Sequence, residues 1–479
     1  MSQQSFHRII FKNTGLFGIS QFVKIVVKLI SNKVAAIFLG TAGIGMIGLL
    51  ENILALIQGF TSLGIASSSV REVAVLDGDS KKEKRLLKVL YHWAIITGFL
   101  GFLVAIIFSN YINKEVFENE NHLNWVLALS VYFIFSAITS IRLSVLQAKK
   151  QVSKIVQFHI VSAVITAILA ITLYYFFQEE GIIPVFIFSS FFQFLFSFYL
   201  TRNIQISKDK IKFKEVVNEG MPMIKLGILL SISAIFGQIC FYIIRWFLKE
   251  KYSFDTLGIY QVSNTLLVGY LGLVFSAMAN DYYPRLCNYE NDTKRLNDLV
   301  NDQTEMALLV VVPAILMLYL IAPFLIELLY SKDFLDVLKV LKFGLFAIVL
   351  KAIVWPIGFI PLIKGNKLLY LKQNLLGDGV NVIASILLFY QFGFLGLGIA
   401  MVTMFFISGI YNFYTAKLNY NFQFRKNTLQ VLFVSCLIGL LAVLTILFTE
   451  FSNFNYYIIL LFIVSVLYSF FTMKNKLTV

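Results

Sequence analysis

Apolar segments long enough to cross a bilayer follow one another along the whole chain, separated by short polar gaps. A helix needs roughly 20 apolar residues to cross about 30 Å of hydrocarbon, and about fourteen segments meet that length. They lie at 9–38, 44–69, 86–109, 123–147, 155–177, 182–201, 222–248, 256–281, 304–330, 335–363, 367–390, 394–418, 428–449 and 455–473. The pattern predicts an all-α polytopic membrane protein with about 14 transmembrane helices.

The charged residues give this bundle a direction. The 479-residue chain is 58% hydrophobic and 14% charged, and it carries a net charge of +14. Nearly all of the basic residues lie in every second gap, whereas the opposite gaps hold only Lys114, Lys249, Lys251 and Lys332. This positive-inside bias predicts that both termini are cytoplasmic. It also accounts for the basic charge without nucleic acid, so no nucleic-acid partner is expected.

A weak internal repeat links the two halves of the chain. The stretch GLLENILALIQGFTSLGIASSSVRE, from Gly48, resembles GIYQVSNTLLVGYLGLVFSAMANDY, from Gly258, about 210 residues later. Six spans per copy is an even number, so a pseudo-two-fold along the membrane normal would relate the copies. Chance similarity between apolar helices is the alternative. We expect an N-terminal six-helix lobe (1–202), a basic cytoplasmic linker (203–221), a C-terminal six-helix lobe (222–420) and an extra helix pair (421–479).

The first span carries a polar stripe. Gln21, Lys24, Lys28 and Ser31 recur at spacings of three and four, which places them on one helix face. Lys24 lies roughly 22 Å into the span at 1.5 Å per residue, too deep to snorkel easily. Ionisable groups at membrane depth usually face a cavity or a partner. The stripe favours a cationic cavity for an anionic group such as phosphate. The alternative is structural pairing, because Glu51 in the second span could reach Lys28 or Lys33.

Other spans carry further polar candidates for a cavity lining. Glu51 and Gln58 share a face of the second span, and Arg245 lies near the outer end of the seventh. Gln261 and Asn264 lie in the eighth span, at or next to the repeat positions of Glu51. Amides in spans also hydrogen-bond neighbouring helices, and an arginine near a span end can snorkel. Both alternatives stay open for these residues.

Two oppositely charged residues lie at matching depths in consecutive spans. Lys351 is about twelve residues from the cytoplasmic end of the tenth span, and Asp378 is about eleven residues into the eleventh. A structural ion pair is one interpretation. The other is a proton or cation site for coupling, in which Asp378, Lys351 and Glu51 are the candidate residues. Arg142 and Glu327 lie near span ends, where long side chains snorkel.

The sequence offers no pattern that favours catalysis. The histidines are scattered (His7, His92, His122 and His159) and form no set with metal-ligand spacing. No glycine-rich phosphate loop with a following lysine is present, and no nucleophile–base arrangement can be identified. We therefore expect neither an enzyme nor a bound metal or cofactor.

Several motifs carry a family resemblance. GLFGISQFVKIVVKLISNKVAAIFLGTAGIGMIGLL (15–50) resembles the opening of Wzx-type polysaccharide flippases, also described as O-antigen or enterobacterial-common-antigen translocases. They belong to the multidrug/oligosaccharidyl-lipid/polysaccharide exporter superfamily. LQAKKQ (146–151), IYQVSN (259–264), YYPRL (282–286) and GFLGLGIAM (393–401) fit in order and at the right spans. The additional pair of spans at 428–473 resembles the last two spans of the fourteen-span lipid II flippases.

The resemblance implies two lobes around a central cavity that opens alternately to each face of the bacterial inner membrane. The cargo would be an undecaprenyl-pyrophosphate-linked oligosaccharide, with Lys24 and Lys28 at the positions of the family's basic residues. The implied partners are a coupling proton or sodium ion, the lipid bilayer, a polysaccharide polymerase and a chain-length regulator. The alternatives are a cation-coupled multidrug antiporter, a lipid II flippase and, less favoured, a polytopic polysaccharide polymerase. A cationic first span disfavours organic cations as cargo.

Overall fold

The computed structural model describes residues 3–76, 80–118, 122–149, 151–207, 209–287, 289–448 and 451–477. Inside its helices, the side chains of 3–25, 71, 74, 75, 80, 226, 229, 230, 280, 281, 284, 451–455 and 475–477 are outside the description. Every long element in the described ranges is a helix, and no strand occurs there. The all-α prediction is confirmed.

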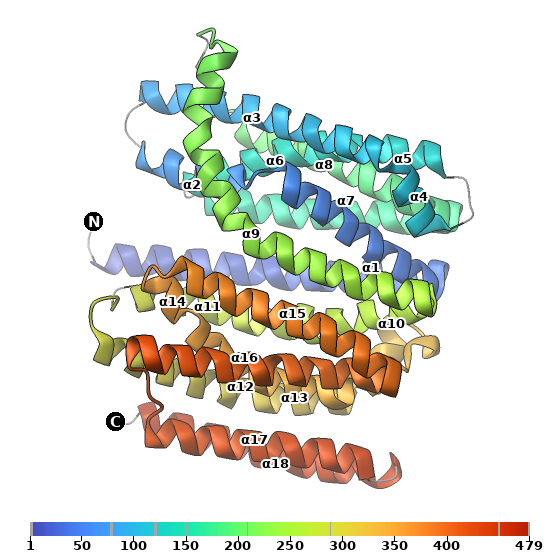
Figure 1. Ribbon diagram of the computed structural model, residues 1–479, viewed down its shortest axis with the longest axis vertical. Helices are drawn as coiled ribbons and strands as arrows, with labels where there is room; N and C mark the ends of the chain where they lie inside the picture. The colour runs from blue at the N-terminus through green and yellow to red at the C-terminus, as the bar shows by residue number, and fades with distance from the viewer. Residues whose placement is uncertain are drawn as a thin grey trace. The chain divides into compact units, whose positions relative to one another are not determined.

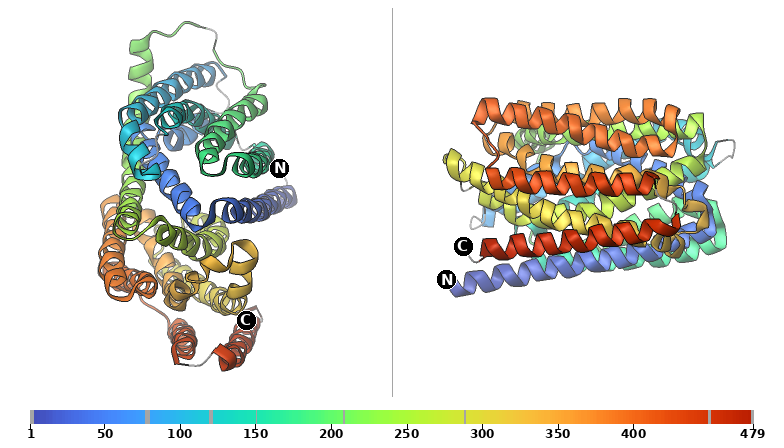
Figure 2. Two further views of the ribbon diagram at one scale, coloured as in Figure 1. Left: turned by 90° about the vertical axis from the view of Figure 1, so that its right-hand side faces the viewer. Right: turned by 90° about the horizontal axis from the view of Figure 1, so that it is seen from below.

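The chain divides into two compact units, Met1–Tyr242 and Ile243–Val479. Unit 1 contains α1 (Gln3–Thr61), α2 (Ile65–Val75), α3 (Ser80–Ile107), α4 (Ser109–Phe117), α5 (Leu123–Leu129), α6 (Val131–Ala148), α7 (Val152–Phe177), η1 (Gln178–Gly181), α8 (Ile182–Thr201) and most of α9 (Phe213–Lys251). Unit 2 continues with α10 (Phe254–Asn264), the π-helical turn η2 (Thr265–Tyr270), α11 (Leu271–Cys287), α12 (Thr293–Leu329), η3 (Lys332–Phe334), α13 (Val337–Gly358), α14 (Ile360–Ile363), α15 (Lys367–Phe392), α16 (Phe394–Tyr420), α17 (Lys426–Phe448) and α18 (Phe451–Leu477). Within each unit the long helices run side by side (Figures 1 and 2).

The helices account for the predicted spans. Twelve helical ranges are long and apolar enough to cross a membrane. Two of them, Val26–Thr61 and Val152–Thr201, each overlap two of the predicted segments, so the twelve ranges correspond to all fourteen. The chain is therefore a multi-pass membrane protein. The domain boundaries expected from the repeat stay a prediction.

A glycine separates the first two spans. Gly40 lies inside α1 with φ 65° and ψ −161°, a conformation that side-chain-bearing residues rarely adopt. No other heavy atom lies within 4 Å of the position that a Cβ would take. The requirement for glycine is therefore conformational rather than steric. The sharp break lets residues from both halves of α1 line one cavity.

A second glycine pair brings α9 against the end of α1. Gly64 has φ +61°, and a Cβ added there would lie 2.2 Å from the carbonyl oxygen of Gly227 on α9. A Cβ on Gly227 would lie 2.4 Å from the carbonyl oxygen of Leu63. The two segments thus cross backbone to backbone. Nearer the start of α9, the indole of Trp93 on α3 donates a hydrogen bond of 3.0 Å to the carbonyl of Val216.

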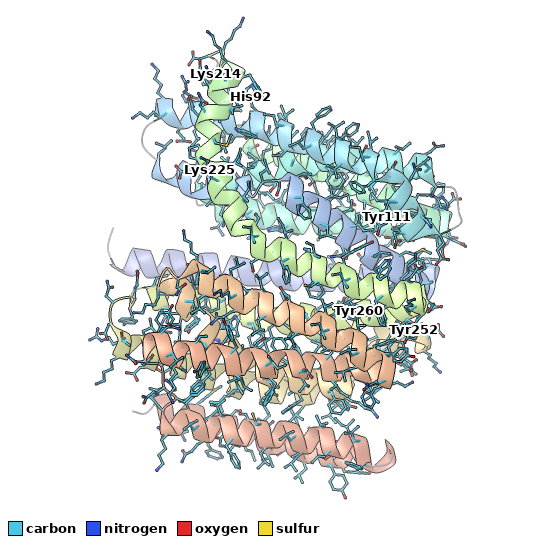
Figure 3. The ribbon with its side chains drawn as sticks, viewed as in Figure 1. His92, Tyr111, Lys214, Lys225, Tyr252 and Tyr260 are labelled. Atoms are coloured by element: carbon cyan, nitrogen blue, oxygen red, sulfur yellow. The ribbon has the colours of Figure 1, made fainter. Side chains whose placement is uncertain are left out.

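Farther along α9, a hydrogen bond joins the hydroxyl of Tyr242 to that of Tyr111 on α4. Figure 3 labels Tyr111. Together with the contacts nearer its start, this bond holds α9 against the rest of unit 1. The division between the units falls inside this helix, after Tyr242. These attachments fix the part of α9 that belongs to unit 1.

The C-terminal helices pack on unit 2. Helices α17 and α18 both contact α12, and α17 also contacts α13 (Figure 1). Their connection to α12 is polar: Arg425 pairs with Asp302 and lies 3.5 Å from the carboxylate of Glu305. The Glu305 side chain is 1% exposed and also accepts a hydrogen bond from the hydroxyl of Thr428. A buried carboxylate is thus satisfied by the segment that begins α17.

Candidate functional site

Unit 1 contains a cavity of about 590 Å³ between α1, α6, α7 and α8. Lys28 lines it from the first half of α1, and Glu51 lines it from the second half, beyond the break at Gly40. Among the described residues no ion pair joins Lys28 to Glu51. The structure thus brings two of the predicted residues to one cavity, with both charges available to a ligand. Its volume lies within the range of about 300–1,000 Å³ that is usual for ligand pockets.

The remaining lining is rich in hydroxyl and amide groups. These are Ser31, Asn32, Tyr132, Ser162, Thr166, Tyr174, Ser189, Ser190 and Gln193, with His159 beside them. The hydroxyl oxygens of Ser162 and Ser189 are buried and have no hydrogen-bond partner in the described part of the chain. A buried hydroxyl without a partner costs about 1–3 kcal/mol. The cavity therefore holds polar groups that a bound polar ligand would satisfy.

The other predicted residues of the first two spans have different outcomes. The side chains of Gln21 and Lys24 lie outside the described residues. Gln58 lies away from the Lys28 cavity, beside a hollow of about 20 Å³, where its amide donates a hydrogen bond of 2.8 Å to Ser136 on α6. This contact matches the interhelical hydrogen bonding that was the alternative for the amides.

The predicted residues near the start of unit 2 contact each other and their own helix. Arg245 at the end of α9 donates a hydrogen bond of 2.9 Å to the side-chain oxygen of Gln261 on α10. Asn264 donates a hydrogen bond of 3.1 Å to the carbonyl of Tyr260, one turn earlier in α10. The π-helical turn η2 follows directly after Asn264. Ligand contact by these residues stays a prediction.

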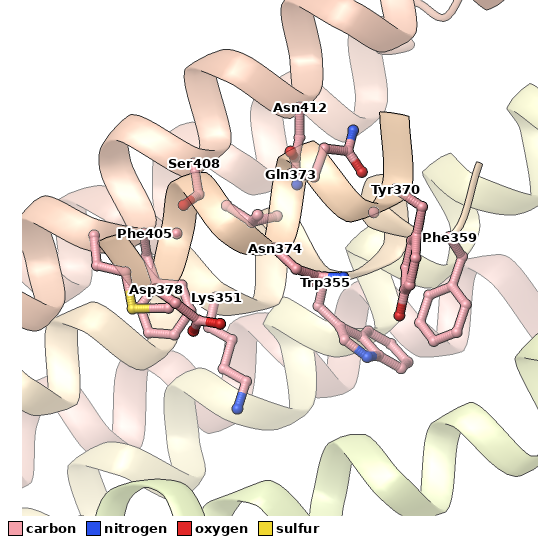
Figure 4. Close-up of a pocket in the computed structure, with 14 residues that line it drawn as sticks. Lys351, Trp355, Phe359, Tyr370, Gln373, Asn374, Asp378, Phe405, Ser408 and Asn412 are labelled. Atoms are coloured by element: carbon pink, nitrogen blue, oxygen red, sulfur yellow. The ribbon is translucent and has the colours of Figure 1, made fainter. Parts of the chain in front are cut away.

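Unit 2 contains a second cavity, of about 320 Å³, between α13, α15 and α16 (Figure 4). Lys351 and Asp378, predicted from matching depths, both line it. No ion pair joins them within the described residues. The ammonium of Lys351 lies 5.0 Å from the centroid of the Phe275 ring and 6.0 Å from that of Phe405. The two charged groups therefore share a cavity without neutralising each other directly.

Three polar residues of this cavity were not predicted as site residues: Gln373, Ser408 and Asn412. Each is at most 6% exposed, and each has a side-chain oxygen without a hydrogen-bond partner in the described part of the chain. Together with the Asp378 carboxylate they place four oxygen-bearing side chains on the lining of one cavity. Ser408 and Asn412 are four residues apart on α16, a spacing that could have drawn attention to them.

The sequence of this chain matches a known protein family. The profile of the family described as "Polysaccharide biosynthesis protein" matches residues 34–339. This chain belongs to that family. The matched range includes α1 from residue 34 onward, all of unit 1 after it, and unit 2 as far as the start of α13. A search of curated proteins finds no match to this chain.

Solved structures share the fold of this family member. The lipid II flippase MurJ in an inward closed conformation is similar with a TM-score of 0.72 at 16% identity, over 97% of this chain and 100% of that one. An inward-facing multidrug resistance transporter of the MATE family is similar with a TM-score of 0.65 at 13% identity, over 83% of this chain and 94% of that one. A MATE transporter of Vibrio cholerae is similar with a TM-score of 0.61 at 15% identity, over 88% of this chain and 99% of that one. At these identities the likeness concerns the fold.

Proposed function

We propose that this protein is a flippase that moves an undecaprenyl-pyrophosphate-linked oligosaccharide from the cytoplasmic to the outer leaflet of the bacterial inner membrane. The observation that carries the proposal is Lys28 in a roomy, hydroxyl-lined cavity of a polysaccharide biosynthesis family member. A pyrophosphate that leaves water needs compensating charge, and sugar hydroxyls need hydrogen-bond partners. Lys28 offers the charge, and the unpartnered Ser162 and Ser189 offer hydrogen bonds.

Mass spectrometry of lipids from a deletion strain of the native host tests the cargo. Under the proposal, undecaprenyl-pyrophosphate oligosaccharide accumulates and surface polysaccharide is lost. Accumulation of lipid II instead would favour the lipid II flippase, which the similarity to MurJ over the whole chain supports. Unchanged lipid-linked intermediates with intact surface polysaccharide would favour a multidrug antiporter, in a strain that lacks any second flippase. The MATE-like fold and the carboxylate in each cavity support that second candidate.

Lysine variants test the cationic cavity. Each charge-assisted contact to a pyrophosphate is worth about 1.5–3 kcal/mol, so replacing Lys24 and Lys28 by Ala should lower cargo affinity by roughly 10²–10⁴. Export should then be abolished while the protein still inserts into the membrane. Lys28→Arg keeps the charge and should keep part of the export. Lys339→Ala removes an exposed lysine that pairs with Asp336 one turn away, and it serves as the control. Wild-type export by the Lys24→Ala/Lys28→Ala double variant would refute the cationic cavity.

Ion coupling is the second part of the proposal, and we assign it to the unit 2 cavity. Oxygen donors from a carboxylate, two amides and a hydroxyl suit a hard cation such as Na⁺. Asp378 supplies the negative charge, and the unpartnered oxygens of Gln373, Ser408 and Asn412 supply neutral donors. Transport by reconstituted protein under an imposed Na⁺ gradient, compared with an imposed proton gradient, tests the choice of ion. Equal transport under both gradients and without either would refute coupling.

A further inference from the structure

Lys351 belongs to two cavities at once. It lines the unit 2 cavity with Asp378, and it also lines a separate hollow of about 330 Å³ beside η2 and α11. Trp355, one turn later on α13, lines both as well. One side chain is therefore placed between an acidic space and a second space with a different lining.

The second hollow has no acidic group among the described residues that line it. Its walls include Gly269 and Gly272, where a Cβ would meet no other heavy atom closer than 3.8 Å. The hydroxyl of Ser276, also on the wall, donates a hydrogen bond of 3.0 Å to the carbonyl of Gly272. Among the described residues that line this hollow, Lys351 alone carries a charge. A cation between glycine walls suits an anionic group that approaches the backbone closely.

The position of the ammonium indicates which space it serves in this structure. It lies 5.0 Å from the ring centroid of Phe275, which lines the glycine-walled hollow, and 6.0 Å from that of Phe405, which lines the acidic cavity. The ammonium is therefore nearer to the hollow. Figure 4 shows it on the opposite side of the acidic cavity from Gln373 and Asn412. A lysine ammonium is a compact charge on a flexible four-carbon stem. The same residue can therefore serve Asp378 in one rotamer and the hollow in another.

We propose that Lys351 is a charge switch that links the ion cavity to an anion site in the glycine-walled hollow. When a cation occupies the oxygen donors around Asp378, it repels the ammonium into the hollow, where Lys351 binds a phosphate group. When the cation leaves, the ammonium pairs with Asp378, and the hollow loses its positive charge. This inference rests on the proposed function for the identity of the ion and of the phosphate-bearing cargo.

The switch predicts reciprocal linkage, because a ligand that changes the affinity for another is itself affected by the same factor. In full-length protein in lipid nanodiscs, we expect Na⁺ to raise the affinity for farnesyl pyrophosphate by about tenfold or more, relative to choline at equal ionic strength. Lys351→Gln should bind the pyrophosphate weakly with or without Na⁺. Asp378→Asn should bind it tightly without Na⁺, because the ammonium loses its alternative partner. Lys339→Gln, with an exposed lysine, should behave as the wild type.

Direct binding of ²²Na⁺ separates this inference from the proposed cargo. Lys351→Gln removes the competing ammonium and should bind Na⁺ severalfold more tightly, whether or not a pyrophosphate is the cargo. Unchanged or weaker Na⁺ binding by well-folded Lys351→Gln would overturn the switch. If Na⁺ binds more tightly but no protein binds farnesyl pyrophosphate, the assigned anion falls together with the proposed cargo. Should either single variant fold poorly, the Lys351→Gln/Asp378→Asn double variant, with no net charge change, should bind farnesyl pyrophosphate weakly and equally with and without Na⁺. Tight or Na⁺-dependent binding by the double variant would also overturn the switch.

Discussion

Arg425 joins the C-terminal helix pair to α12, and its removal tests how that pair is held. The guanidinium lies 3.8 Å from Asp298, pairs with Asp302 and lies 3.5 Å from Glu305. Burial lowers the pKa of Arg425, but hydrogen bonding and attraction to Asp302, with the charges of Glu305 and Asp298, outweigh it and leave the pKa above its ordinary value. The arginine is thus a permanent partner for the buried Glu305.

The expected loss of stability in Arg425→Ala depends on how deeply the ion pair is buried. Breaking a fully buried ion pair by removing one partner costs about 3–5 kcal/mol. Here the Arg425 side chain is 38% exposed, so water screens part of its interaction, and Glu305 keeps its hydrogen bond from Thr428. A charged hydrogen bond is worth about 1.5–3 kcal/mol, so we expect Arg425→Ala to cost about 2 kcal/mol. In a unit of this size that corresponds to a fall in Tm of roughly 4–8 °C.

A thiol-reactive dye can follow the thermal unfolding. Cys436 is partly buried on α17 and reports on the helix pair once Cys287→Ser and Cys240→Ala have removed the other two thiols. Arg295→Ala is the control, because Arg295 is 70% exposed and pairs with Asp292 within one helical turn. Such a surface pair is worth about 0–1 kcal/mol. Adding Glu305→Gln to Arg425→Ala should recover most of the lost stability, since the buried side chain at position 305 is then neutral. Equal effects of the two arginine variants, or no recovery, would refute the reasoning.

Three further predictions concern other parts of the molecule. Gly64→Ala should lower the free energy of unfolding by about 2–5 kcal/mol, because the backbone there is left-handed and the new Cβ clashes with Gly227. Gly365→Ala, with φ +69° and nothing within 4 Å, should lower it by only about 1–2 kcal/mol. Equal Tm shifts would disprove the close crossing. Ser189→Ala should leave the free energy of unfolding unchanged or raise it by about 1 kcal/mol, because the substitution removes an unpartnered buried hydroxyl. It should also weaken binding of prenyl-pyrophosphate sugar, and a lower Tm would indicate a structural hydroxyl instead. Asp378→Asn should abolish the dependence of transport on the ion gradient in proteoliposomes, and loss of folded protein would point to a structural carboxylate.

Much of the fold follows from the sequence, because the bilayer fixes the length of each crossing and demands internally satisfied backbone. The break at Gly40 and the two-span ranges of the helices fit the predicted segments closely. Helix periodicity placed Lys28 in a polar stripe, with Glu51 of the next span as its candidate partner, and the structure places both residues at one cavity. A polar stripe on a single helix can be found from spacing alone.

Features that depend on which helices are neighbours could not be found in this way. The unit 2 cavity needs α13, α15 and α16 together, and a single-helix pattern cannot show that Gln373 and Asn412 face the same space as Asp378. Arg142 is a second case, since a position near a span end predicts a snorkelling side chain. The structure instead buries it at 6% exposure, with its guanidinium 3.5 Å from the ring centroid of Phe198 and 4.8 Å from that of Tyr91.

The crossing at Gly64 and Gly227 has a consequence for how this fold diverges. A membrane span accepts almost any apolar side chain, so identity along the spans can fall to the 13–16% seen against solved structures while the fold persists. The backbone crossing leaves no such freedom, because a side chain at either glycine would occupy the space of the other segment's carbonyl. We expect substitutions at the two positions to be tolerated only as a pair with a displaced α9. In distant relatives this pair is therefore a better marker of homology than any hydrophobic stretch.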